Sequence, residues 1–266
     1  SRGLGDVYKR QELASQLTEQ VKTAFENGSL LDTVTPVTQD LLKFWFMEPY
    51  TEERSKNFHE GQKQSILNII YLHEVLQVTT VEEIYRQVAP DLLAECNLSD
   101  LAKEKYRIPK YAVKMATGTG KTWVMHALLL WQLLNARHEE QEERSGRYTQ
   151  NFLIVAPGLI VYDRLKDAYC GRLKENCTER DPFTNDLYLH KDLFIPPAYR
   201  DEVFSFIQNN VVTKEEGIGR TITGNGLIAL TNWHLFLSDE EKENMDSDSA
   251  PSIIRDLLPI TPGLSG

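Results

Sequence analysis

The stretch KMATGTGKTWV, residues 114–124, constrains the fold more than any other part of the chain. Its two closely spaced glycines, Gly118 and Gly120, allow backbone conformations in which successive N–H groups turn toward phosphate oxygens. Lys121 adds a positive charge for the outer phosphates of a nucleotide, and the hydroxyl of Thr122 is a suitable ligand for Mg²⁺. The stretch therefore predicts a phosphate-binding loop that holds ATP and Mg²⁺.

The residues on either side of this loop indicate its structural context. YAVKM, residues 111–115, is a short apolar run typical of a buried strand, and WVMHALLLWQLLNAR after the loop predicts a long helix. A strand, a glycine loop and a helix N-terminus in this order form an anion site, to which the helix dipole contributes. We expect Thr117 and Thr119 to lie in the same nucleotide site. In the general GxxxxGK[ST] pattern the first glycine would fall at Met115, so the generic match is incomplete.

Composition sets the outer limits of these predictions. The chain has 266 residues, of which 41% are hydrophobic, so it can bury the core of one large domain or two small ones. The formal net charge of −10 and the absence of a basic cluster mean that any DNA-binding surface has to be local. Three cysteines without metal-ligand spacing predict reduced thiols in a cytoplasmic protein, and no apolar run approaches the ~20 residues of a membrane span.

The chain divides into segments that differ in composition and in the spacing of apolar residues. Residues 1–11, SRGLGDVYKRQ, are set aside because DVYKRQ matches one translated frame of a sequencing-library adapter, the alternative being a native polar tail. Residues 12–106 show helical spacing of apolar residues and predict about four helices in an accessory region, the first of which ends at Asn27-Gly28.

From residue 107 the pattern changes to alternating strands and helices. NFLIVAPG, residues 151–158, and GLIALTNWHLF, residues 226–236, predict buried strands of a parallel sheet, which binds ligands at the carboxyl ends of its strands. The stretch at 181–200 is too rich in proline for an assignment.

These motifs together resemble a known family. From about Thr38 to its end, the chain resembles the N-terminal part of the helicase or ATPase subunit of type III restriction enzymes, which are DEAD/DEAH-like superfamily 2 proteins. MATGTGKT is similar to motif I of that superfamily, where the first position is commonly not glycine. The resemblance implies an α/β fold: an incomplete RecA-like P-loop domain with a parallel sheet at 107–266, preceded by the helical accessory region.

The same resemblance assigns further site residues. NFHEGQKQSI, residues 57–66, resembles the segment upstream of motif I and implies that Gln62 reads adenine, whose N6 and N7 an amide can pair with in both directions. FLIVAPGLIVYDRL resembles motif Ia, and ALTNWHLF resembles the strand that carries motif Ib. They imply contacts with the DNA backbone from Pro157, Gly158, Arg164, Thr231 and Asn232, although a strand-end turn and a capped helix are alternative interpretations.

ATP hydrolysis in this class also needs an acidic residue that holds Mg²⁺. LIVYD ends in Asp163, but Pro157-Gly158 already ends a strand and leaves no room for a parallel crossover, so we expect Asp163 in a helix, with a metal role as the alternative. The family's DExH strand, second RecA-like domain with its arginine finger, and endonuclease domain do not occur in these residues. We therefore expect a fragment, truncated before the DExH motif, that does not turn over ATP by itself.

The leading hypothesis is an ATP-dependent DNA helicase or translocase subunit of a restriction system, with Lys121 as its catalytic residue. Its expected partners are double-stranded DNA and a methyltransferase or specificity subunit, without a membrane. Two alternatives stay open: an unrelated P-loop ATPase or kinase, and a natural non-catalytic module that binds nucleotide or DNA.

Overall fold

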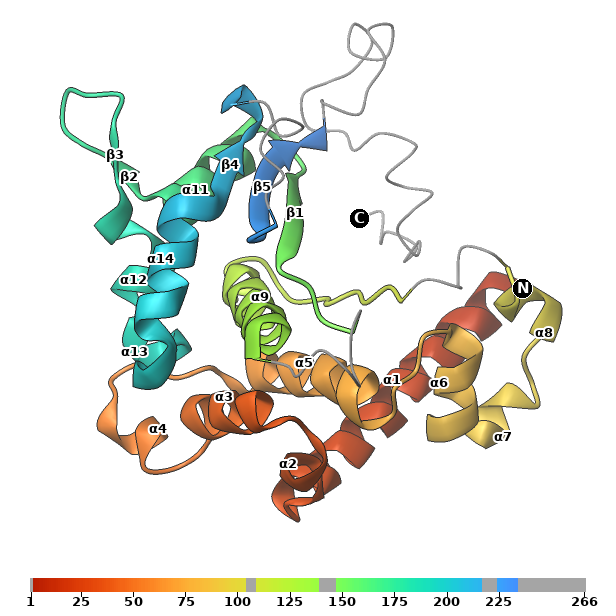
Figure 1. Cartoon of the computed structure of the whole chain (residues 1–266). Helices are drawn as coiled ribbons and strands as arrows, with labels where there is room; N and C mark the ends of the chain where they lie inside the picture. Colours follow the sequence, from red (N-terminus) through yellow and green to blue (C-terminus); the bar gives the residue numbers. More distant parts are fainter. Residues whose placement is uncertain (1, 104–108, 139–146, 217–223, 234–266) are drawn as a thin grey trace, which may run out of the picture. The chain divides into compact units, whose positions relative to one another are not determined.

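The computed structural model describes residues 2–103, 109–138, 147–216 and 224–233 (Figure 1). These residues form two compact units: 2–42 with 58–125, and 43–57 with 126–233. The division differs from the boundary expected near residue 107, because the glycine loop groups with the helical region. Within the described ranges, no helix combines the length and the apolar character needed to cross a membrane.

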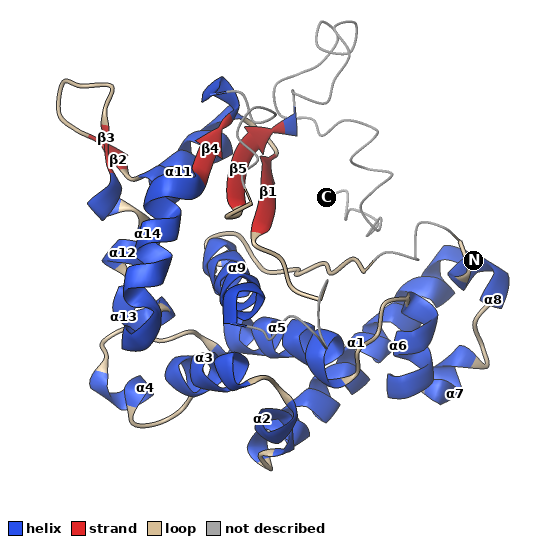
Figure 2. Ribbon diagram, in the orientation of Figure 1, coloured by secondary structure: helices blue, strands red, loops and turns tan. Residues whose placement is uncertain are grey.

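The first unit is helical, as the pattern of residues 12–106 predicts (Figure 2). Helix α1 starts at Arg2, so residues 2–11 of the segment set aside in the sequence are part of the helix. It ends at Glu26, two residues before Gly28, whose φ is +84°. The other elements are α2 (Ser29–Thr33), α5 (Glu60–Ile70), the π-helix η1 (Tyr71–Val75), α6 (Val81–Val88), α7 (Pro90–Leu93) and α8 (Leu98–Leu101). Helices α3 (Pro36–Phe46) and α9 (Lys121–His138) contribute residues to both units.

The core of the first unit lies between α1 and α5, which contact each other. Val21 of α1 and Ile66 and Ile70 of α5 are fully buried. Two hydrogen bonds flank this apolar contact, from Gln20 Nε2 to the Tyr71 hydroxyl at 3.0 Å and from Asn68 Nδ2 to Thr18 Oγ1 at 3.1 Å. The packing fixes α5, and with it the position of Gln62 in its first turn.

The strand predicted immediately before the glycine loop is not found. Residues 109–116 form neither helix nor strand, and the ring of Tyr111 is 37% exposed. A parallel strand exists only through hydrogen bonds to a neighbour, and none of the described strands pairs with this segment. The helix predicted after the loop is confirmed, because α9 begins at Lys121.

The second unit contains a parallel sheet whose three strands lie side by side in the order β1-β5-β4 (Figure 2). β1 (Asn151–Ala156) and β5 (Leu227–Asn232) confirm the two strands expected from the sequence, and β4 (Val211–Thr213) adds a third. β1 and β5 pair from Asn151↔Leu227 to Ala156↔Asn232. Every residue of β5 is buried, whereas β1 exposes Leu153 and Val155, so only β5 has the burial expected for both strands.

Helices cover this sheet. α11 (Leu159–Cys170) contacts all three strands, and α14 (Arg200–Asn210) contacts β4 and β5. Asp163 lies in α11, which confirms that it is a helix residue. The remaining elements are α4 (Tyr50–Glu53), β2 (Arg172–Leu173), β3 (Arg180–Asp181), η3 (Pro182–Thr184), α12 (Asp186–Leu189), α13 (Lys191–Phe194), η4 (Pro197–Tyr199) and η5 (Lys214–Glu216). The mixed α/β class with a parallel sheet is confirmed.

A buried polar group joins three helices of the second unit. His126 of α9 is 0% exposed; its Nδ1 lies 2.9 Å from the hydroxyl of Tyr169 in α11, and its Nε2 lies 3.1 Å from Oδ2 of Asp186 in α12. An ionised carboxylate only accepts hydrogen bonds, so Nε2 is protonated and donates a hydrogen bond to Asp186. In the neutral ring, Nδ1 then accepts from Tyr169. This pairing satisfies a ring that would otherwise be costly to bury.

Candidate functional site

The glycine loop has the backbone expected for an anion cradle. Gly118 and Gly120 have φ angles of +80° and +75°, in the left-handed region that side chains disfavour. The loop leads directly into α9, whose first turn contains no acidic residue. The positive end of the helix dipole therefore faces the loop without a carboxylate in that turn to neutralise it.

Lys121 is folded back onto this loop. Its Nζ donates to the carbonyl of Ala116 at 3.1 Å, and Thr119 Oγ1 donates to the same carbonyl at 2.6 Å. Lys121 is nevertheless exposed. Since, among the described residues, the ammonium bonds only to a neutral carbonyl oxygen, a phosphate can attract it more strongly.

Thr117 and Thr122 are both exposed and lie on either side of the glycines. No described residue forms a hydrogen bond with either hydroxyl. The Thr122 oxygen is thus accessible to a metal ion that accompanies a nucleotide. The structure brings all six predicted loop residues together within one accessible segment.

Gln62 reaches this loop from α5 and is buried. Its Nε2 donates to the carbonyl of Gly120 at 3.1 Å and more weakly to that of Thr119 at 3.4 Å, while its Oε1 accepts from the N–H of His59 at 3.0 Å. His59 caps α5 and places its own Nε2 2.8 Å from the carbonyl of Thr119. Both ends of the Gln62 amide are occupied by the protein, so reading adenine requires the amide to exchange these partners.

The described residues contain no group of three or more His, Cys, Asp or Glu side chains arranged to hold a metal ion. Asp163, the alternative metal acid, is exposed on α11 and pairs with Lys166 at 2.9 Å. Its carboxylate is therefore engaged in a surface ion pair one turn along its own helix. The metal ligand that the loop itself offers is Thr122.

A second accessible segment follows β1. Pro157 and Gly158 connect β1 to α11, and Gly158 is the N-cap of that helix, with no side chain capping its first turn. Arg164 is exposed on α11, and no described residue pairs with its guanidinium. Free helix N–H groups and an arginine are the chemistry that contacts phosphates without reading bases.

The other two predicted DNA contacts are in a different environment. Thr231 and Asn232, at the end of β5, are 0% and 1% exposed. The Asn232 amide has no hydrogen-bond partner in the described part of the chain. Neither side chain is accessible to DNA in this conformation, and the residues that follow Trp233 in the predicted motif Ib lie outside the described ranges.

The sequence did not predict two further residues that hold these segments. His59 holds the glycine loop through Thr119, and Trp233, which is fully buried, donates its indole N–H to the carbonyl of Pro157. Trp233 directly follows a buried strand, and an indole there signals a hydrogen bond to a neighbouring strand end. His59 stands three residues before Gln62, the spacing of a helix cap and its partner.

Comparison with known proteins identifies one family. The family model described as "Type III restriction enzyme, res subunit" matches residues 47–256, a range that includes Gln62, the glycine loop and the whole sheet. No curated protein and no solved structure matches the chain.

Proposed function

Since the chain belongs to the type III restriction enzyme res subunit family, whose members are helicase-like ATPases, we propose that it binds ATP with Mg²⁺ at the glycine loop and tracks double-stranded DNA. The observation that carries this proposal is the loop itself. Positive φ angles at Gly118 and Gly120, an exposed Lys121 and a helix N-terminus without an acidic residue in its first turn form a phosphate cradle. Family membership also argues against the unrelated ATPase or kinase.

Each loop residue has a separate part in nucleotide binding. The main-chain N–H groups of residues 117–121 surround the phosphates, and Lys121 exchanges the Ala116 carbonyl for an outer phosphate. The Thr122 hydroxyl is a ligand for Mg²⁺, which supplies charge neutralisation when bound. Gln62 exchanges the Gly120 carbonyl for the adenine edge, and His59 limits the movement of the loop.

The DNA contact is proposed at the segment between β1 and α11. Pro157 and Gly158 present the N-terminal amides of α11 to a phosphate, and Arg164 adds a cation about one and a half turns along the same helix. Trp233 fixes this segment by its bond to Pro157. In the cytoplasm, a methyltransferase or specificity subunit would be the second partner, as suits a restriction subunit of this family.

The nucleotide assignment is tested with the Lys121→Ala variant of the res subunit that contains this sequence. We expect DNA-stimulated ATP hydrolysis to fall by about 10²-fold or more, because no described residue replaces the charge next to the phosphates. Lys114→Ala is the matched control, since Lys114 is an exposed lysine of the same segment outside the glycine turn. Hydrolysis by the Lys121→Ala variant at the level of the control would disprove the assignment.

The DNA assignment has an independent test. Arg164→Glu should weaken binding to duplexes of any sequence by a similar factor, and the slope of log K against log salt should fall by about 1, the value for one lost phosphate contact. Lys174→Glu is the control, because Lys174 is an exposed lysine of the same unit, already paired with Glu179. Equal effects of the two substitutions would contradict a specific role for Arg164.

A further inference from the structure

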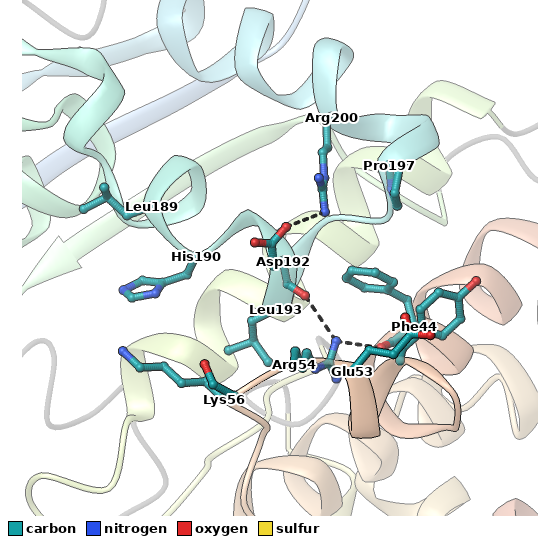
Figure 3. Close-up of a pocket in the computed structure, with 12 residues that line it drawn as sticks. Phe44, Glu53, Arg54, Lys56, Leu189, His190, Asp192, Leu193, Pro197 and Arg200 are labelled. Carbon is teal, nitrogen blue, oxygen red and sulfur yellow. Dashed lines mark hydrogen bonds and ion pairs between the residues drawn. The ribbon is translucent and has the colours of Figure 1, made fainter.

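The second unit contains a pocket that the proposed ATP site does not use (Figure 3). Its volume is about 750 Å³, within the roughly 300–1,000 Å³ of small-molecule sites. One wall comes from the end of α3 and from α4 with the residues after it, and the other from the segment between α12 and the start of α14. The pocket is therefore large enough for a small organic ligand.

Arg54 is built into the first wall. Its guanidinium donates to Asn57 Oδ1 at 2.6 Å and to the main-chain carbonyls of Phe44 and Trp45 at 2.8 and 2.5 Å, with a longer contact to the Asp192 carbonyl at 3.4 Å. All four partners are neutral oxygen atoms. Burial lowers the pKa of Arg54, which shows that the charged form loses solvation there. The positive charge of Arg54 therefore remains uncompensated by these partners.

The second arginine of the pocket differs in this respect. Arg200 donates to Asp192 Oδ1 at 2.9 Å and to the Ile195 carbonyl at 3.0 Å (Figure 3). Arg200 and Asp192 neutralise each other, so they shape the wall without adding net charge. The remaining carboxylate is that of Glu53, which is exposed and able to accept hydrogen bonds.

Lys56 adds a second uncompensated cation. Its side chain and that of His190 extend to the same side of the pocket (Figure 3). Lys56 is exposed, and no described residue forms a hydrogen bond or an ion pair with it. The pKa of His190 is lowered mainly by burial and also by the charge of Lys56. The neutral ring of His190 is therefore favoured beside the ammonium.

The pocket also presents an aromatic surface. The ring of Tyr50 is 41% exposed and rests against the ring of Phe44, with 5.1 Å between the centroids. Leu189, on the opposite wall, is 46% exposed. Tyr50 therefore presents an exposed ring on which a flat apolar group can lie.

We propose that this pocket binds a phosphomonoester joined to an aromatic base, either a free nucleoside monophosphate or the phosphorylated end of a nucleic-acid strand. A phosphomonoester carries about −1.5 to −2 charges at pH 7, which matches the two uncompensated cations Arg54 and Lys56. Lys56 contacts the phosphate directly, and the positive charge of Arg54 attracts the phosphate electrostatically from its place in the wall. Tyr50 stacks on the base. Glu53 accepts from an amino or hydroxyl group of the ligand.

The test uses the protein with the Lys121→Ala substitution, which removes phosphate binding at the glycine loop. Calorimetric titration with AMP should give a Kd tighter than about 1 mM, with adenosine and ribose 5-phosphate each weaker by about tenfold or more. Lys56→Glu should weaken AMP binding by about tenfold or more, whereas Lys43→Glu, an equal change at an exposed lysine of α3 outside the pocket, should change it less than about twofold.

The aromatic contribution is tested in the same way. Tyr50→Ala should weaken AMP by about tenfold, and Phe183→Ala, which removes a ring that is 57% exposed and does not line the pocket, should not. A second titration compares a 5′-phosphorylated oligonucleotide with its unphosphorylated form and so separates the two sources. Tighter binding of the phosphorylated strand indicates a strand end, and tighter binding of AMP indicates a free nucleoside monophosphate. Either result supports the proposal. Circular dichroism first establishes that every variant is folded. Absence of saturable binding of both probes, or binding unchanged by Lys56→Glu and Tyr50→Ala, overturns it.

Discussion

The Gln62 side chain closes over Gly120. Its Nε2 donates to the Gly120 carbonyl at 3.1 Å, and a Cβ added at Gly120 would lie 2.3 Å from that nitrogen. Two independent features therefore favour glycine at position 120: the positive φ angle and the close approach of the Gln62 amide from α5. Gly118 has only the first requirement, because a Cβ there would meet nothing within 4 Å.

Comparison of Gly120→Ala with Gly118→Ala separates these two effects. Each substitution should destabilise the loop by about 1–2 kcal/mol because of the left-handed backbone. Gly120→Ala should also displace Gln62 and so weaken ATP more than Gly118→Ala does. In a Gln62→Ala background the difference in ATP affinity should disappear, which fluorescence titration can measure. A difference that persists in that background would show that Gln62 is not its cause.

The role of Gln62 in base selection is a separate prediction. If its amide exchanges the Gly120 carbonyl for adenine, Gln62→Ala should weaken ATP more than GTP by about 1–3 kcal/mol, the cost of an unpaired polar edge. Competition between the two nucleotides measures this difference directly. Gln64→Ala is a suitable control, because Gln64 is two residues along α5 and bonds to Asn68 instead of the loop. Equal losses for both nucleotides would mean that Gln62 only supports the loop.

The sequence was sufficient to predict the loop residues but not their partners. Glycine and lysine spacing is a local property, and it correctly predicted a glycine loop that opens α9. The contact of His59 with Thr119 joins residues 60 positions apart, and a single sequence holds no signal for that pairing. A different limitation affects Thr231 and Asn232, because the apolar run predicts a buried strand but does not show whether the last two side chains of that strand face solvent.

His126 offers a test of stability. His126→Phe should leave the buried hydroxyl of Tyr169 without its partner and lower the free energy of unfolding by about 1–3 kcal/mol. Adding Tyr169→Phe removes the orphaned hydroxyl and should recover part of the loss. His138→Phe is the control, because His138 is a half-exposed histidine of the same helix, and its effect should stay within about 0.5 kcal/mol. Urea unfolding compares these three variants with the wild type and with the Tyr169→Phe single variant. Strictly additive losses would contradict the coupling.

Cysteine reactivity tests burial in α11. Burial raises the pKa of Cys170 to about 11, so little of its reactive thiolate exists at pH 8. Cys177 is exposed. Iodoacetamide should therefore label Cys177 first, and Cys177→Ser should remove that fast phase. Labelling of Cys170 should accelerate as the pH rises toward 11, because the thiolate fraction grows about tenfold per pH unit below the pKa. Peptide mapping that finds Cys170 modified as fast as Cys177 at pH 8 would contradict this.

The fold was predictable where an apolar run identifies an element. α9 and β5 each carry such a run, and the strand end at Pro157-Gly158 predicted that Asp163 lies in a helix, which is α11. The segment at 181–200 instead forms several one-turn helices, such as α12, which begins where the Asn185 side chain accepts from the N–H of Tyr188. Single turns have no periodicity to detect. β4 was missed for a related reason, since its three residues become a strand only by pairing with β5.

The central place of β5 has a consequence for motion. With a parallel neighbour on each side and every residue buried, its amide hydrogens should be among the last in the second unit to exchange with deuterated solvent, whereas those of β1, which exposes Leu153 and Val155, should exchange earlier. Trp233 extends from this slow strand to Pro157. The Pro157–Gly158 segment, which we propose contacts DNA, is thus held to the strand whose amides exchange most slowly. Its fluctuations should therefore be small in amplitude, even when hydrogen bonds of β1 open transiently.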